Sequence, residues 1–333
     1  MSVDFEWDVL FVEETMEAEM KAHSPRGPEL PPAPYSWKMD LVIKTPPLEV
    51  LKASLHGNFP VMERDWPADS VINVSHKTEG SQREPFHRLH HRSIDTLGGM
   101  IGWNDSRHLH FEGPRSWPCV GTIMNCHCKA EYKKDPDRRK TTRFFVDIPP
   151  LEVVDAFREA RQVDWYVGRW PVGAPHRSRQ CINRYGRFCD YDALCAKHGT
   201  EAFADELLEY EVIDKQAMLD PPSPYGASRY DVMNRCDMLH HLSYDLNLVP
   251  LGTGSFNMSI GSAFHLLLAA TYRGHSTDEE RRKWRSLPVD ARRGGLKHAK
   301  VYADENLGGV FRHCVAEEDE LAEETFSYTT EGD

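Results

Sequence analysis

The sequence predicts an α/β protein in which helices flank a mixed central sheet. Short segments that alternate between apolar and polar residues, or are apolar throughout, predict strands at 5–13, 35–43, 71–78, 120–125 and 143–148. Segments with helical apolar spacing predict helices near 93–103, 150–166, 200–213, 228–248 and 261–270. Strands and helices that interleave along a chain are typical of a sheet covered by helices.

Length and composition restrict the class of protein. The chain has 333 residues, of which 40% are hydrophobic and 28% charged, and its formal net charge is −12. These values indicate a sizeable core, and no apolar run approaches the roughly 20 residues that cross a bilayer. The acidic N-terminus lacks the basic start of a secretory signal, so we expect a cytoplasmic protein with reduced thiols.

Three predicted strands carry charged residues where these would be costly in a core. Glu13 ends the first strand, Asp40 lies inside the second, and Lys77 ends the third. A buried aspartate needs a partner or a metal ion, although an aspartate at a sheet edge could simply face water. Lysine at a strand end can neutralise developing negative charge.

A proline-rich segment separates the C-terminal part of the chain from the part before it. Residues 214–229, which contain Pro221, Pro222, Pro224 and Gly226, predict a linker between residues 1–213 and 230–333. The helix expected at 261–270 is apolar on nearly every face and contains His265. A histidine in such a place is either a satisfied core residue or a ligand.

Three of the eight cysteines fall within fifteen residues, at Cys181, Cys189 and Cys195. Cys236 follows beyond the linker, among Asn, Arg and Asp. Four thiolates can hold zinc or an iron–sulfur cluster, and the spacing C-x7-C-x5-C lacks the short C-x2-C pairs of zinc ribbons. The sequence therefore favours a cluster, with buried reduced thiols as the alternative.

Two basic stretches could bind nucleic acid despite the negative net charge, or could be solvated faces. They are Lys133, Lys134, Arg138, Arg139, Lys140 and Arg143, and Arg281, Arg282, Lys283, Arg285, Arg292, Arg293, Lys297 and Lys300.

These parts resemble the iron–sulfur branch of the PD-(D/E)XK nuclease superfamily, which includes RecB- and AddB-like, CRISPR-associated and phage exonucleases. Gly261-Ser-Ala-Phe-His265 resembles its G-x-x-x-H helix, Trp37-Lys38-Met39-Asp40 its G-x-x-D motif, and Ser75-His76-Lys77-Thr78 its (D/E)-x-K-T motif. The order is rotated, because the segments around Cys236 and His265 usually open the family fold. The chain thus resembles a circular permutant in which residues 230–333 complete the domain begun by residues 1–213.

The resemblance implies a restriction-endonuclease-like core with an iron–sulfur helical subregion. It implies a DNA exonuclease that acts on single strands or duplex ends, alone or with recombination, CRISPR or phage replication proteins. Asp40, His265 and Glu13 would hold Mg²⁺ or Mn²⁺, Lys77 would assist catalysis, and Cys181, Cys189, Cys195 and Cys236 would hold a [4Fe–4S] cluster.

Three positions depart from the family pattern. Ser75 replaces the carboxylate of (D/E)-x-K, Trp37 replaces the glycine of G-x-x-D, and Thr96 to Met100 lacks the family's Q-x-x-x-Y. Candidate substitute carboxylates besides Glu13 are Glu63, Asp65, Asp69 and Glu79. The alternatives are therefore a degenerate nuclease fold that binds DNA or protein without cutting it, and an unrelated zinc-stabilised interaction protein.

Overall fold

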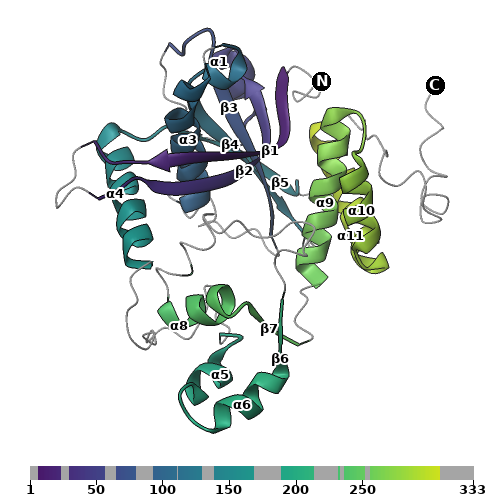
Figure 1. The fold of residues 1–333 in the computed structure, drawn as a ribbon. Helices are drawn as coiled ribbons and strands as arrows, with labels where there is room; N and C mark the ends of the chain where they lie inside the picture. Colours follow the sequence, from purple (N-terminus) through teal and green to yellow (C-terminus); the bar gives the residue numbers. More distant parts are fainter. Residues whose placement is uncertain are drawn as a thin grey trace.

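A five-stranded sheet forms the centre of the protein, in the order β1-β2-β3-β4-β5 (Figure 1). The computed structural model describes residues 7–23, 30–56, 65–79, 93–110, 112–129, 139–168, 189–213, 232, 236–251 and 256–307. The strands are β1 Val9–Met20, β2 Ala33–Lys44, β3 Val71–Glu79, β4 Cys119–Cys128 and β5 Thr141–Asp147. All neighbours are antiparallel except β3 and β4. This mixed sheet confirms the predicted α/β class.

The one parallel pair explains the position of the first long helix. Parallel neighbours need a crossover connection, and α3 Ile94–Ser106 lies between β3 and β4 in the chain. Two short 3₁₀ turns, η2 Arg107–Leu109 and η3 Pro114–Ser116, complete this connection. Every residue of β4 is buried, as expected for a strand that is covered on both faces.

Helices α3 and α4 Leu151–Gly168 cover one face of the sheet (Figure 1). The core on this face joins strand residues such as Trp37, Met124 and Phe144 to Met100 of α3 and Phe157 of α4. A second core on the opposite face contains Leu41, Ile72 and Phe145, together with Leu51 of the short helix α1 Leu48–Ser54. The alternating strand pattern therefore buries apolar residues on both faces.

The C-terminal helices form a layer beside the sheet: α9 Phe256–Arg273, α10 Asp278–Ser286 and α11 Val289–Asn306 (Figure 1). Helix α9 contacts β1 and β2 and packs along α11. A Cβ on Gly295 of α11 would lie 2.3 Å from Ala263 Cβ, so glycine lets the two helices approach closely. Tyr272 of α9 also contacts the second core, which contains Leu41 and Ile72. This contact joins the helical layer to the strands.

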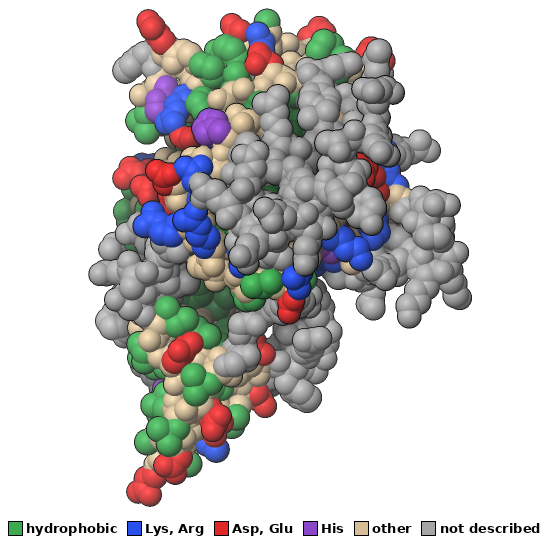
Figure 2. Space-filling view, turned by 90° about the vertical axis from the view of Figure 1, so that its right-hand side faces the viewer, with side chains coloured by type: hydrophobic (Ala, Val, Ile, Leu, Met, Phe, Trp, Pro, Cys, Tyr) green, Lys and Arg blue, Asp and Glu red, His purple; other side chains and the backbone are tan. Residues whose placement is uncertain are grey.

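A small lobe contains the described cysteines that follow residue 188, below the sheet in Figure 1. Its elements are α5 Asp192–Lys197, α6 Ala202–Glu206, the 3₁₀ turn η4 Leu207–Glu209, β6 Tyr210–Val212, α8 Asp237–His240, the π-helical turn η5 His241–Asp245 and β7 Leu248–Pro250. Figure 2 shows acidic and hydrophobic side chains over much of the lobe, at the bottom of the view.

Two predicted helices of this lobe end earlier than expected. The helix predicted over 200–213 breaks after Glu206, and the one predicted over 228–248 ends at Asp245. The cause is pairing between β6 and β7, which satisfies backbone groups that a helix would otherwise pair. The predicted linker, residues 214–229, lies outside the described residues.

No helix among the described ranges is long and apolar enough to cross a membrane.

Two glycines of helix α3 allow it to lie close to two aromatic rings of β2. A Cβ on Gly98 would lie 1.9 Å from Tyr35 Oη, and one on Gly102 would lie 2.5 Å from the Trp37 ring. Both rings are buried, so neither can move aside easily.

We predict that Gly102→Ala lowers the free energy of unfolding by about 1–3 kcal/mol, because overpacking against Trp37 outweighs the better helix propensity of alanine. Gly99→Ala is the matched control, since its new Cβ would lie 3.6 Å from Asn73, at ordinary contact distance. Urea denaturation followed by circular dichroism measures both variants. Equal stability of the two would contradict the packing argument.

Candidate metal site

The pairing between β2 and β3 ends just before Asp40. Strands β2 and β3 pair from Lys44 and Val71 to Leu41 and Val74, and Asp40 is the next residue of β2. From there β2 stays with β1, while β3 continues beside β4 as far as Glu79. The His76 backbone N–H, which lies past the last β2–β3 pair, donates a 2.5 Å hydrogen bond to Asp40 Oδ2. The Asp40 side chain thus accepts a backbone hydrogen bond at the point where the pairing between β2 and β3 ends.

Glu13 lies opposite Asp40 on the neighbouring strand. Val12 pairs with Leu41 and Glu14 with Met39, which places Glu13 across from Asp40. Its φ is +55°, a left-handed conformation that residues other than glycine adopt rarely and that often marks functional sites. The sequence predicted Glu13 at a strand end, whereas β1 continues to Met20. That prediction of the strand boundary was wrong, because residues 14–20 pair with β2.

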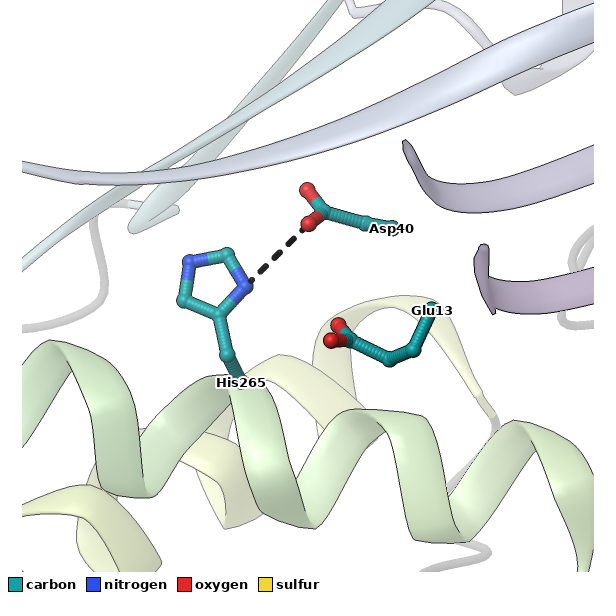
Figure 3. Close-up of side chains that lie close together, drawn as sticks. All are labelled: Glu13, Asp40 and His265. Atoms are coloured by element: carbon teal, nitrogen blue, oxygen red, sulfur yellow. Dashed lines mark ion pairs between the residues drawn. The ribbon is translucent and has the colours of Figure 1, made fainter. Parts of the chain in front are cut away.

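His265 reaches the same place from α9 (Figure 3). Its Nδ1 lies 3.7 Å from Asp40 Oδ1. Gly261, one helical turn earlier, packs on β3, where an added Cβ would lie 3.0 Å from Thr78 Oγ1. A small residue therefore allows α9 to come close enough for its histidine to meet the aspartate.

One ligand atom from each of Glu13, Asp40 and His265 lies within 4.8 Å of the other two. Figure 3 shows the three side chains converging from two strands and one helix. Among the described residues, this is the group of three histidines, cysteines or carboxylates found at that spacing. Two carboxylate oxygens and an imidazole nitrogen are suitable donors for a divalent ion such as Mg²⁺ or Mn²⁺.

The two carboxyl groups differ in protonation. Burial, and next the charge of Asp40, raise the pKa of Glu13 to about 7, although Lys38 acts in the opposite direction. Burial would also raise the pKa of Asp40, but His265, His76, Lys77 and the His76 N–H together lower it below its ordinary value. Burial lowers the pKa of His265 although the charge of Asp40 acts in the opposite direction, and a lowered pKa favours the neutral imidazole that binds a metal.

Comparison of the chain with protein-family models, curated proteins and solved structures gave no match.

Lys77 is a half-buried residue of β3, and its charge acts on both Asp40 and His265. It therefore belongs to the surroundings of the same site. Ser75, two residues earlier, is also half-buried and offers a hydroxyl in place of a carboxylate. Of the other candidate carboxylates, Asp65 and Asp69 are exposed; Glu63 and the Glu79 side chain lie outside the described part.

A network of buried hydrogen bonds connects the sheet next to the site with helix α11. Arg143 Nε donates to Asn125 Oδ1 at 2.6 Å, and Asn125 Nδ2 donates to Tyr302 Oη of α11 at 3.1 Å. The same asparagine lies 3.4 Å from His76 Nδ1. Arg143 was expected in an exposed basic stretch but is 1% exposed. That expectation was wrong, because the guanidinium joins β5 to α11.

Three of the four predicted cluster cysteines pack around one small core in the lobe. Cys189, Cys195 and Cys236 all contact the cluster of Tyr191, Leu194, Met238, Leu242 and Leu248. Burial, and then the nearby Cys189, raise the pKa of Tyr191 to about 12. Cys181 lies outside the described residues.

Two residues near the metal site were not singled out as candidates from the sequence. His76 places its N–H on Asp40, and Lys38 forms an ion pair with Glu13. Lys38 does carry a recognisable signal: it lies two residues before Asp40, so in a strand the two side chains share a face. His76 acts through its backbone, which its residue type does not reveal.

We predict that the site binds Mn²⁺ about tenfold more tightly at pH 8 than at pH 6, because Glu13, with a pKa of about 7, must lose its proton to become a ligand. The sign for folding is opposite: without metal, stability falls as the pH rises from 4.5 through 7, since ionised Glu13 is buried beside Asp40. Isothermal titration calorimetry in buffers of different ionisation enthalpy measures both affinity and proton release. Glu13→Gln should abolish the pH dependence, and the same Mn²⁺ affinity at pH 6 and pH 8 in the wild type would contradict the assignment of this proton.

Proposed function

We propose that the protein is a metal-dependent deoxyribonuclease of the exonuclease type, with a PD-(D/E)XK-like site and a [4Fe–4S] cluster. The observation that carries this proposal is the meeting of Glu13, Asp40 and His265 at the point where β2 and β3 part. Lys77 acts on the same group of charges. The mixed sheet flanked by helices also supports it, since the resemblance implies a core of that kind.

The residues of the site have distinct roles in this proposal. Asp40, Glu13 and His265 would hold a Mg²⁺ or Mn²⁺ ion, which when bound lowers the pKa of water and draws charge from a phosphate. The His76 N–H holds the Asp40 carboxylate in its orientation. The Lys77 ammonium neutralises charge that develops on the scissile phosphate. Glu13 supplies the second carboxylate that Ser75 does not.

The packing of the late helices supports the rotated chain order. His265 belongs to the last part of the sequence, and its helix α9 contacts strands β1 and β2 from the first part. We propose that residues 214–229 join what are the two ends of the fold in the related nucleases. Distant chain positions that meet in space make such a rearrangement possible.

The charge distribution favours one side of the molecule for DNA. Residues 189–213 contain seven acidic residues and one lysine, so the lobe repels phosphates. Residues 281–300 contain eight basic residues and one acidic residue. Arg282, Arg285, Lys297 and Lys300 on α10 and α11 are exposed, and we propose that this layer attracts the strand.

The nuclease proposal predicts metal-dependent release of nucleotides from the ends of single-stranded or duplex DNA. Asp40→Asn, His265→Ala and Lys77→Ala should each lower the rate by about 10²-fold or more, since each removes a metal ligand or the cation that stabilises charge. End-labelled oligonucleotides in Mn²⁺ or Mg²⁺ measure the rate, with a closed circular substrate to separate exonuclease from endonuclease activity.

Asp69→Asn is the matched control, because this aspartate is exposed and should keep full activity. If the wild type releases no nucleotide but still binds DNA, the second candidate function holds: a degenerate nuclease fold that binds without cutting. Ser75 in the position of the usual carboxylate is the observation that favours it.

The four-thiol cluster is a separate part of the proposal. Cys189, Cys195 and Cys236 share one small core, although their sulfurs are not gathered within the 4.8 Å that unites the metal site. The spacing C-x7-C-x5-C, without the short C-x2-C pairs of zinc ribbons, is what favours a cubic cluster, which would tie Cys236 to the segment before the linker.

We predict that protein purified without oxygen absorbs near about 400 nm and contains about four iron atoms per chain. Cys236→Ser should lose both signals, because a cube needs its fourth ligand, whereas Cys128→Ala should keep them, since Cys128 is buried in β4. Absorption spectroscopy with iron and zinc analysis makes the measurement. A colourless protein with one zinc per chain would replace the cluster with a zinc site.

A further inference from the structure

Lys38 is the exposed residue of an otherwise buried or half-buried strand. The burial pattern of β2 leaves only Lys38 in the exposed class, and 41% of its side chain is accessible. Its Nζ forms an ion pair with Glu13 Oε2 on the neighbouring strand. Glu13 itself is only 18% exposed, so the lysine lies at the outer side of a mostly buried carboxylate.

The same Glu13 carboxylate is also within reach of the other two candidate ligands. One of its oxygens lies within 4.8 Å of ligand atoms of Asp40 and His265. A divalent ion among these three residues would carry two positive charges near the Lys38 ammonium. The ion and the lysine therefore compete for one carboxylate, because like charges repel strongly at short range.

In the metal-free protein, the ion pair between Lys38 and Glu13 reduces the repulsion between two carboxylates. Two carboxylates that face each other across β1 and β2 repel each other unless a cation is near. Lys38 supplies that cation from the same sheet, two residues before Asp40. A lysine has a flexible four-carbon stem and a compact charge, so it can leave Glu13 without any movement of the strand.

We propose that Lys38 is a resident counter-cation of the metal site: it holds the Glu13 carboxylate when no metal is bound, and metal entry displaces its ammonium to bind a phosphate of the DNA substrate. The second half of this proposal rests on the proposed nuclease function. Lys38 is thus a positioning residue before metal binding and a substrate-binding residue afterwards. An ordinary surface ion pair would do neither, and typically contributes little to stability.

Lys38→Met separates these roles because it keeps the apolar stem and removes the charge. We expect Lys38→Met to bind Mn²⁺ at pH 8 about threefold or more tightly than the wild type, since a repelling charge is lost. We expect the same variant to bind a single-stranded oligonucleotide about threefold or more weakly in Ca²⁺, since a phosphate contact is lost. Calorimetry measures the first affinity and fluorescence anisotropy the second.

Two variants serve as controls. Lys38→Arg keeps a positive charge and should stay closer to the wild type than Lys38→Met in both affinities. Lys21→Met removes an exposed lysine that directly follows β1 and should leave Mn²⁺ affinity unchanged. Opposite changes in the two affinities are the decisive result, because a partly unfolded variant would weaken both.

Weaker or unchanged Mn²⁺ binding by Lys38→Met would overturn the counter-cation role. Tighter Mn²⁺ binding with unchanged DNA binding would overturn the phosphate contact alone. If the wild type binds Mn²⁺ but no DNA, the nuclease proposal and the phosphate contact fail, while the Mn²⁺ comparison still decides whether Lys38 competes for Glu13. A wild type that binds no Mn²⁺ overturns the whole inference.

Discussion

The parting of β2 and β3 at Asp40 is the constraint on which the rest of the site depends. Inside a continuous sheet, the His76 N–H would bond to a neighbouring strand, and no polar side chain would be needed there. Because the pairing stops at Leu41 and Val74, the Asp40 carboxylate accepts this N–H instead. The fold thus obtains a buried, oriented carboxylate from an interruption of its own hydrogen-bond ladder.

The C-terminal helices α9 and α11 complete the three-residue site, because α9 brings His265 to Asp40 and Glu13. Gly261 allows α9 to lie close to Thr78, and Gly295 allows α11 to lie close to Ala263. Behind them, Arg143, Asn125 and Tyr302 join the sheet to α11 through buried hydrogen bonds. Such networks are stabilising only when their members are satisfied. They therefore favour one position of the helical layer, and with it one position of His265.

A large residue of β2 and a small residue of α3 fit each other in the packing. The ring of Trp37 needs space on the α3 side of the sheet, and helix α3 provides that space at Gly102. A large residue on the strand and a small one on the helix preserve the distance between the two layers.

Local sequence patterns were enough to place the five strands of the central sheet, apart from the extent of β1, and to mark the unusual polar residues within apolar segments, because alternation and burial cost are local properties. Asp40 and His265 could be recognised in this way. Three features of the site depend on the folded chain: Glu13 faces Asp40, Lys38 pairs with Glu13, and Arg143 is buried. Strand register, a left-handed residue inside a strand and the docking of a distant helix depend on contacts between segments far apart in the chain, and no local pattern contains that information.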